Sequence, residues 1–272
     1  MTVYLDHAAS SPIRTSVLEL YTKTLGEIGN PSSVHSFGQR SRQILETARE
    51  QIAAAINCDR NEVIFTSGGT ESDNLAIKGL YWHANGLDSN RKLIISAAAE
   101  HHAVLDTVNW LASSQGAELY LVPTDNQGVL DLADLERVLE QRSSDVALIS
   151  LMWANNEIGV IHPISKITEL ARKYEVPVHS DAIAALGHIP VNFAESGLAA
   201  MTITGHKLGG PVGSGALILR RSQKITPVVH GGGQERNLRS GTPDAAAAAA
   251  LALTVTEAVS EQEALAKTHQ IF

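Results

Sequence analysis

The sequence predicts an α/β fold built on a mainly parallel β-sheet flanked by helices, and two observations support this. Short apolar segments recur along the chain, and several are continuous, as is typical of strands covered on both faces. Between most of them lie longer segments with the apolar spacing of amphipathic helices. Such an alternation needs crossover connections, and crossovers join parallel strands.

Seven strands are expected, at residues 62–66, 93–96, 118–122, 146–152, 177–180, 201–204 and 216–219. Only a loop separates the last two, so one of them should run antiparallel. In sheets of this kind, ligands bind beyond the carboxyl ends of the strands. The side chains that follow those ends are therefore the first candidates for a functional site.

Four amphipathic helices are expected between the strands, at residues 71–84, 104–113, 131–141 and 165–174. Asp131 and Ser165 are residue types that favour the N-cap position, and Pro163 suits the approach to a helix. No internal repeat and no Ser/Pro-rich linker interrupts this pattern.

The two ends set the expected domain boundaries. Residues 1–14 should form an extended arm and residues 15–256 one large domain. From Pro243 onward the sequence favours a single helix that reaches Phe272 without a C-cap signal. We therefore expect residues 257–272 to begin a connecting helix to a C-terminal domain that this chain lacks.

Composition narrows the class of protein. The 272 residues are 44% hydrophobic and carry a formal charge of −8, which argues against nucleic-acid binding. The longest run of small apolar residues, 245–255, is far short of the roughly 20 residues that span a bilayer, so no membrane contact is expected. One cysteine, Cys58, and no signal peptide favour a cytoplasmic protein.

Lys207 is the first candidate for chemistry. It follows strand 201–204 and precedes a glycine-rich turn. A cationic lysine is costly to bury, so this position favours a neutral amine that forms a Schiff base with a carbonyl. Asp181 ends another strand, where a carboxylate could keep a pyridinium nitrogen protonated. At about 4 Å and an effective dielectric near 20 that attraction is roughly 4 kcal/mol. The alternative is an aspartate that only caps the next turn.

A third candidate is the Thr-Ser-Gly-Gly-Thr segment at 66–70, which follows a strand and opens a helix. Glycine lets backbone amides approach an anion, and a helix N-terminus adds partial positive charge, so Gly69 and Thr70 are expected phosphate contacts. A plain Ser/Thr N-cap is the alternative. Together, this loop, Lys207 and Asp181 indicate pyridoxal 5′-phosphate.

Three further segments carry weaker signals. His101 and His102 follow strand 93–96; an imidazole there could stack on a pyridine ring and move protons, or could be an ordinary histidine. No second His or Cys pair at ligand spacing accompanies them, so no metal site is expected.

The adjacent amides in 153–159 suit a ligand contact or an Asx turn, and the Gly- and Arg-rich segment 230–242 suits an anion, a subunit contact or a hinge.

Taken in order, these motifs resemble the NifS/IscS-type cysteine desulfurases, which are class V, fold-type I enzymes that use pyridoxal phosphate. The resemblance runs from Tyr4 to the chain end and rests on residues 30–35, 66–74, 100–106, 155–159, 205–207, 230–234 and 239–242. It implies the large domain of a fold-type I PLP-dependent transferase, without the C-terminal small domain.

The resemblance also implies residue roles. Lys207 and His101 would be catalytic, with Lys207 bound to the cofactor aldehyde and His101 stacked on its ring. Asp181 would pair with the ring nitrogen, and Asn156 would reach the ring oxygen. The phosphate would be held by Thr70, Thr204 and His206, and Thr242 would reach the phosphate of the neighbouring subunit in a homodimer.

Two departures from the family pattern bear on activity. Ala184 stands where the family places a glutamine that bonds the ring hydroxyl, a loss of about 1 kcal/mol for one neutral hydrogen bond. The family's nucleophilic cysteine lies in the C-terminal domain, and Cys58 is expected to be a plain surface cysteine rather than a substitute.

The implied function is cysteine desulfuration: L-cysteine becomes L-alanine, and the sulfur passes as an enzyme persulfide to a scaffold protein for iron–sulfur cluster assembly or to a tRNA-thiolation enzyme. We expect this chain alone to bind the cofactor poorly and to turn over little cysteine. The alternatives are another class V lyase or aminotransferase, and a non-catalytic remnant that only dimerises or binds a partner.

Overall fold

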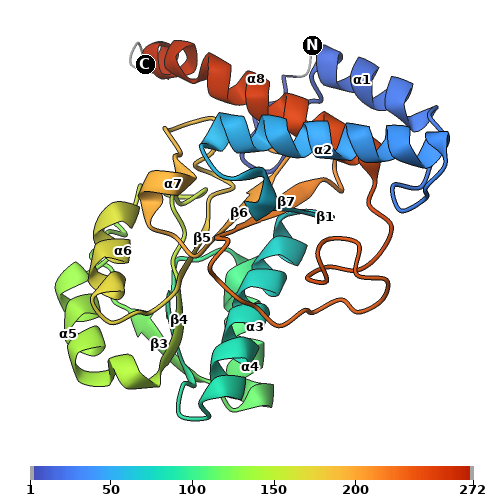
Figure 1. Ribbon diagram of the computed structural model, residues 1–272. Coiled ribbons are helices and arrows are strands. Elements are labelled where there is room, and N and C mark those ends of the chain that lie inside the picture. The colour runs from blue at the N-terminus through green and yellow to red at the C-terminus, as the bar shows by residue number, and fades with distance from the viewer. Residues whose placement is uncertain (1–2, 270–272) are drawn as a thin grey trace.

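The computed structural model describes residues 3–269 and places a seven-stranded sheet between layers of helices (Figure 1). The strands are β1 (Val63–Thr66), β2 (Leu93–Ala97), β3 (Glu118–Val122), β4 (Val146–Ser150), β5 (Val178–Asp181), β6 (Ala200–Thr204) and β7 (Gly215–Leu219). Their order across the sheet is β1-β7-β6-β5-β4-β2-β3. The α/β fold and the seven strands are as the sequence predicts.

Strand direction also agrees with the prediction. β2, β3, β4, β5 and β6 pair in parallel, whereas β7 runs antiparallel to both β6 and β1. The strand boundaries differ slightly. Glu62 belongs to a short 3₁₀ turn, Arg60–Glu62, because its side chain closes a capping box with Asp59. β4 ends at Ser150, before the expected residue 152, and β5 extends to Asp181.

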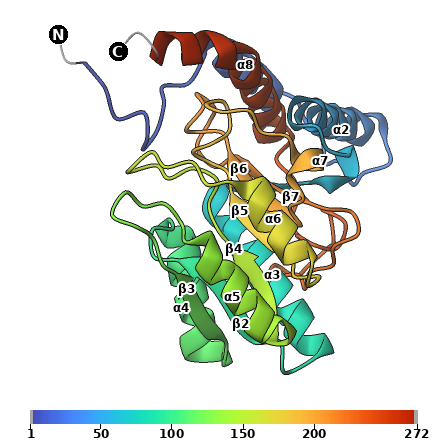
Figure 2. The same cartoon turned by 90° about the vertical axis from the view of Figure 1, so that its left-hand side faces the viewer.

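Two helices cover one face of the sheet, α3 (Gly69–Leu87) and α4 (His102–Gln115), and they enclose one apolar core. The other face and its margin carry α1 (Thr15–Leu25), α2 (Ser36–Ile56), α5 (Leu132–Arg142), α6 (Ile164–Arg172), α7 (Phe193–Ser196) and α8 (Ala245–His269). Figure 2 shows α5 and α6 on the near side of the strands, and Figure 1 shows α1, α2 and α8 side by side.

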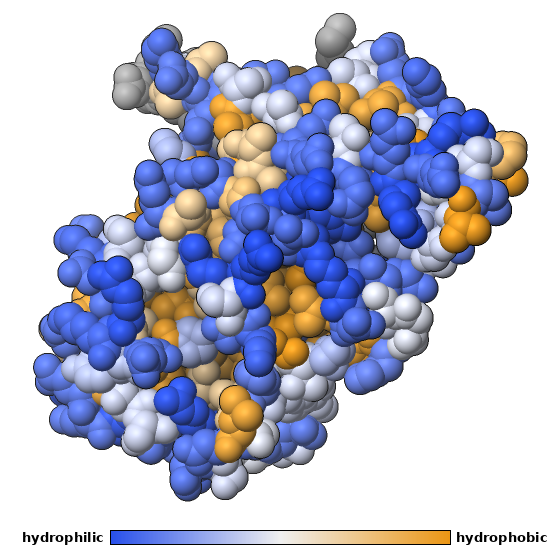
Figure 3. Space-filling model, viewed as in Figure 1, coloured by the Kyte–Doolittle hydropathy of each residue, from blue (hydrophilic) through white to orange (hydrophobic). Residues whose placement is uncertain are grey.

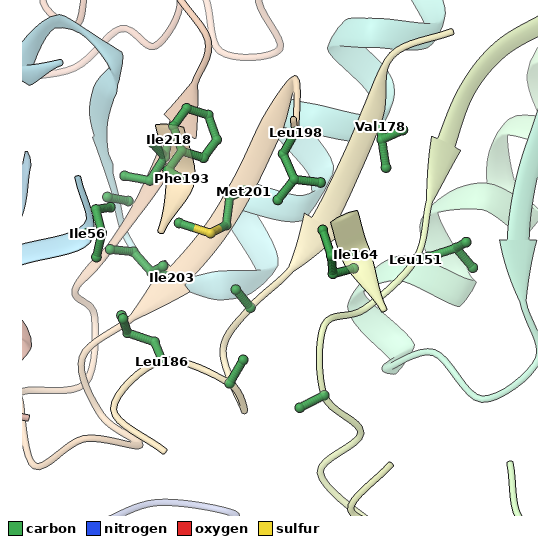
Figure 4. Close-up of a cluster of buried hydrophobic side chains, with 14 of the residues drawn as sticks. Ile56, Leu151, Ile164, Val178, Leu186, Phe193, Leu198, Met201, Ile203 and Ile218 are labelled. Carbon is green, nitrogen blue, oxygen red and sulfur yellow. The ribbon is translucent and has the colours of Figure 1, made fainter. Parts of the chain in front are cut away.

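The larger core fills the second face. Side chains that alternate along the strands, such as Met201 and Ile203 on β6, pack there against Phe193 and Leu186 (Figure 4). Both faces of the central strands are therefore buried, which explains their continuous apolar sequence.

The helix starts include one wrong expectation. Asp131 caps α5 and accepts hydrogen bonds from the amides of Ala133 and Asp134, as predicted. Ser165 does not cap α6, because that helix already begins at Ile164 and its N-cap is Pro163. The helices predicted from the sequence did not include α1, α2 or α7.

The N-terminal arm, residues 3–14, contains no helix or strand and runs along the loop after β6. The amide of Ser11 donates to the carbonyl of His206 at 2.8 Å, and that of Arg14 donates to Gly209 at 2.9 Å. At the other end α8 runs through residue 256 without a break, so the domain division there stays a prediction. The expected uncapped end at 270–272 lies outside the described residues.

Within residues 3–269 no helix is long and apolar enough to cross a membrane. The face seen in Figure 3 is mostly hydrophilic, with hydrophobic side chains gathered in a hollow at its centre. Large apolar side chains that stay exposed include Leu5 in the arm, Ile158 and Val212.

Candidate active site

A cavity of about 580 Å³ lies beyond the carboxyl ends of the parallel strands, within the size range of small-molecule sites. The expected site residues that line it are Gly69, Thr70, His101, Asn156, Asp181, His206 and Lys207. They come from five separate segments, which are loops, helix starts and the end of β5, and the sheet brings these together. Ala184 lines it as well, at the position where the resemblance places a longer glutamine.

Two expected contacts do not line this cavity. Thr204 is buried at the end of β6, and its hydroxyl donates to the carbonyl of Ser214 at 2.9 Å, so it fastens the loop instead. Thr242 lines a separate cavity of about 110 Å³, together with Ser67 and Arg239.

Asp181 contributes a buried carboxyl group to the cavity wall. Its carboxyl group is buried at the end of β5, and its Oδ1 accepts a hydrogen bond from the amide of Ile183 at 2.8 Å. Burial raises the pKa of Asp181, whereas the Ile183 amide and the charges of His101 and Lys207 oppose that rise. The amine of Lys207 and this carboxyl therefore act on one another across a single cavity.

The loop that carries Lys207 is held by the N-terminal arm. The hydroxyl of Ser11 donates to the carbonyl of Lys207 at 2.9 Å, and the guanidinium of Arg14 donates to that of Leu208 at 2.9 Å. Gly209 has a φ of +87°, and a Cβ there would lie 2.8 Å from the side chain of Arg14. This close approach of arm and loop requires glycine.

The start of α3 is suited to an anion. Its N-cap, Gly68, has a φ of +146° and offers no side-chain cap, and the first two residues of the helix, Gly69 and Thr70, line the cavity. The carboxylate of Glu71 fixes the loop by accepting from the amide of Ser67 at 2.7 Å and from Arg239 at 2.7 Å. These bonds hold the pKa of Glu71 below its ordinary value although burial opposes them.

His101 and Asn156 reach the cavity from two further loops. His101 is the N-cap of α4, and its Nδ1 accepts from the amide of Ala103 at 3.0 Å, which leaves Nε2 for other contacts. Asn155 closes the neighbouring turn, because its Oδ1 accepts from the amides of Glu157 and Ile158. Asn156 is thereby left free of the turn and lines the cavity.

Several lining residues were not expected. Asp6, Ala8 and Ala9 belong to the arm, which the sequence presents only as an extended end. Asp73 lies four residues after Gly69 on α3, so helical spacing from the phosphate loop could have identified it.

Cys58 is not the surface residue that was expected. It is half-buried against the larger core, and burial, followed by the charges of Glu62 and Asp59, raises the pKa of its thiol to about 12. Among residues 3–269 no group of three or more His, Cys, Asp or Glu side chains is arranged to hold a metal ion.

The residues present fit pyridoxal 5′-phosphate. An uncapped helix start is suited to the phosphate, the Asp181 carboxyl to a protonated ring nitrogen, and the Lys207 amine to the aldehyde. All three line one cavity of sufficient size. Fold and site together define a fold-type I protein that binds this cofactor.

The comparisons with known proteins agree. The model of the class-V aminotransferase family matches residues 3–271, and the chain belongs to that family. It is 49% identical over 256 residues to an IscS-like cysteine desulfurase of Mycobacterium tuberculosis and 45% identical over 262 residues to the cysteine desulfurase IscS of Dictyoglomus turgidum. These matches cover 94% and 96% of this chain but only 65% of either relative.

Solved structures give the same picture. A NifS-like protein superimposes with a TM-score of 0.93 at 35% identity, covering 98% of this chain and 72% of the other. A structure of SspA in complex with cysteine superimposes with a TM-score of 0.87 at 32% identity, covering 93% of this chain and 72% of that one.

Proposed function

We propose that this chain is the cofactor-binding part of a cysteine desulfurase, which converts L-cysteine to L-alanine and transfers the sulfur. The observation that carries the proposal is the placement of Lys207 and Asp181 in one cavity, in a chain 49% identical to an IscS-like cysteine desulfurase. SspA, which was solved in complex with cysteine, has the same fold and supports cysteine as the substrate.

Bound pyridoxal phosphate supplies an electron sink that weakens bonds around the α-carbon of an amino acid. We assign the anchoring of the cofactor and the proton transfers to residues of this chain. The Lys207 Nζ anchors the cofactor and moves a proton to and from the substrate Cα, and the Asp181 carboxylate holds the ring nitrogen protonated. His101 covers the ring, and its Nε2 is available for proton transfer because Nδ1 is occupied by the Ala103 amide.

Sulfur transfer needs one more group. The carbon–sulfur bond of cysteine breaks as a thiolate attacks the sulfur, which leaves alanine and a persulfide on the attacking group. Cys58 is unsuited to this attack, since its thiol is half-buried, has a raised pKa and does not line the cavity. The attacking thiol therefore comes from outside these 272 residues, and we expect little turnover from this chain alone.

We further propose that the protein acts as a cytoplasmic homodimer and passes sulfur to an acceptor protein. Thr242 lines the small cavity with Ser67 and Arg239 and not the larger one, which supports a role toward a neighbouring subunit. The apolar side chains around the hollow in Figure 3 are a second reason to expect a covering partner.

A second candidate function is that of another class V lyase or aminotransferase. The unsuitability of Cys58 favours it, because such reactions need Lys207 and the cofactor but no attacking thiol.

The test mixes the purified chain with pyridoxal phosphate, L-cysteine and an excess of a small dithiol that can accept sulfur. We expect alanine and sulfide in matching amounts at a slow rate, and neither product from Lys207→Ala. Pyruvate in place of alanine would support the lyase, and no product together with no cofactor binding would contradict both.

A further inference from the structure

Three buried acidic side chains, Asp73, Glu100 and Asp181, are near enough for their charges to act on one another, and two of them, Asp73 and Asp181, line the cavity. Asp181 follows His179 by two residues on β5, so both side chains point to the face that α3 covers. Asp73 belongs to α3 and faces them. All of these side chains are buried.

Asp73 has no partner that could neutralise a charge. Its side chain is 0% exposed, and neither carboxyl oxygen has a hydrogen-bond partner of normal geometry among the described residues. Burial and then the charge of Asp181 raise its pKa, and the neutral hydroxyl of Thr202, which acts the other way, does not reverse this. The basic nitrogen paired with it, Nε2 of His179, lies 3.6 Å from its Oδ1, which is too far for a hydrogen bond. An ionised carboxylate in such a position is very costly.

His179 does not supply the missing positive charge. Its Nδ1 lies 3.0 Å from the hydroxyl of Ser150 and its Nε2 3.1 Å from that of Thr202, so both ring nitrogens are matched by neutral groups. Burial lowers the pKa of His179 to about 3, and the ring is therefore neutral. The contact with Asp73 is not an ion pair.

Asp181 differs from Asp73 in what surrounds it. The Ile183 amide donates to its Oδ1 at 2.8 Å, and Lys207 and His101 line the same cavity. Burial comes first among the causes that raise the pKa of Asp73, followed by the charge of Asp181, and the same two causes act on Glu100. When two neighbouring carboxyl groups have such different surroundings, one holds its proton and the other is ionised.

We propose that Asp73 is a positioning residue for the cofactor site: it stays a neutral carboxylic acid at the cavity wall, so that the negative charge of the pair resides on Asp181. A second anion at Asp73 would repel the Asp181 carboxylate and push a proton onto it. The neutral acid thus preserves the one charge that faces the ring nitrogen. Only the effect on the ring nitrogen rests on the proposed function.

Infrared spectroscopy tests the proton directly on the cofactor-free chain. We expect a carboxylic-acid band at neutral pH that is reduced in Asp73→Asn and kept in Asp181→Asn; because Glu100 is a second buried acid, the difference between wild type and Asp73→Asn isolates Asp73. A band that survives in Asp73→Asn and disappears in Asp181→Asn would place the proton on Asp181 and overturn the proposal.

Stability provides an independent readout. A neutral folded Asp73 keeps a proton that the unfolded chain loses above about pH 4, so wild type becomes less stable as the pH rises, whereas asparagine does not. The melting temperature of Asp73→Asn relative to wild type should therefore increase from about pH 5 to pH 8. A difference that stays constant, or that falls because an ion pair with His179 was lost, would contradict the proposal.

Cofactor titration completes the test. Asp73→Asn should keep the affinity for pyridoxal phosphate within about threefold, whereas Asp181→Asn should lower it by about 100-fold or more. A tenfold loss in Asp73→Asn would contradict the proposal. Because the infrared and melting experiments need no cofactor, they remain decisive even if the proposed function is wrong.

Discussion

At the scale of single residues, the site depends on two ionisable groups that line one cavity, the amine of Lys207 and the carboxyl group of Asp181. Lys207 follows β6 and Asp181 ends β5, and these strands are neighbours in the sheet. The sheet thus fixes the separation of amine and carboxyl before any ligand binds. Preorganised charges of this kind need no rearrangement when the cofactor enters.

The first prediction concerns Asp181→Asn. Removing the anion removes an attraction of up to roughly 4 kcal/mol toward a protonated ring nitrogen, so cofactor affinity should fall by about 100-fold or more. Titration followed by visible absorbance measures this, with Asp88→Asn at the exposed end of α3 as the control. An unchanged affinity would remove Asp181 from the site.

The same carboxyl group predicts a pH dependence. Burial raises the pKa of Asp181 in the folded chain, and the ion pair with the cofactor exists only above that pKa. Cofactor affinity should therefore fall as the pH drops, beginning at a higher pH than an ordinary aspartate would give. Binding that is equally strong at neutral and acidic pH would contradict this.

Most of the site residues that the sequence predicted line the cavity, because strand ends in a parallel sheet converge whatever the intervening helices are. The sequence did not predict Asp73, whose position depends on the helical turn after Gly69, or the arm residues Asp6 and Ala9, which reach the site only through the tertiary fold. Thr204 was expected at the phosphate, yet the local loop uses its hydroxyl.

At the scale of elements, the turn before α3, at residues 67–69, is positioned by β7. A Cβ on Gly215 would lie 2.7 Å from the Cα of Gly68 and 2.8 Å from its carbonyl carbon, and both of these are backbone atoms. The strand therefore packs directly against the turn, with no room for a side chain.

Gly215→Ala should consequently displace this loop and lower the affinity for pyridoxal phosphate by about tenfold or more. Gly86→Ala is the matched control, because a Cβ there meets no atom within 4 Å. It should stabilise the exposed end of α3 by about 0.5–1 kcal/mol. Equal cofactor affinities in the two variants would show that the loop does not depend on β7.

The segment that follows β7 is fastened by a buried ion pair. Arg49 on α2 and Glu235 are 2.9 Å apart, with side chains 4% and 2% exposed, and Glu235 also accepts from the amide of Phe65 on β1. β1 is an edge strand, so Glu235 covers an amide that would otherwise be open to another chain.

Glu235→Ala should cost about 3–5 kcal/mol of unfolding free energy, since it leaves the buried Arg49 with only the half-exposed Glu46 as an acidic partner. Urea denaturation measures the loss. Glu50→Ala, which removes the partner of Arg60 from an exposed pair, should cost far less. A small effect at Glu235 would mean that water reaches Arg49.

Element types were easier to predict than element ends. The buried strands stood out by their continuous apolar residues, and α5 by Asp131. α6 starts before Ser165 because Ile164 is buried in the larger core, so packing rather than capping sets that boundary. α2 was missed although its buried residues, among them Leu45, Ile52 and Ile56, follow a helical period.

At the scale of the whole molecule, two buried groups give the stability opposite pH dependences. His179 stays neutral in the folded chain, with its pKa lowered to about 3, so the unfolded chain takes up a proton below about pH 6.5 and stability falls with acid. Asp73 acts in the other sense, because its raised pKa makes the folded chain hold the extra proton.

A comparison of wild type with His179→Gln separates the contribution of His179 to the pH dependence of stability from that of Asp73. Between pH 6.5 and pH 5 wild type should lose about 1.6 kcal/mol more unfolding free energy than the variant. Urea titrations at both pH values check this, with the exposed His102→Gln as the control. A wild-type loss no larger than that of His179→Gln would show that His179 is already charged in the folded chain.

Cofactor binding in this cavity depends on one amine, that of Lys207. Purified chain is incubated with pyridoxal phosphate and reduced with borohydride, and the modified lysine is located by peptide mass spectrometry, with exposed Lys224 as the internal reference. We predict that the label resides on Lys207 and that Lys207→Ala loses it together with the visible absorbance band. Label spread over surface lysines, or retained in Lys207→Ala, would contradict the assignment of this cavity to the cofactor.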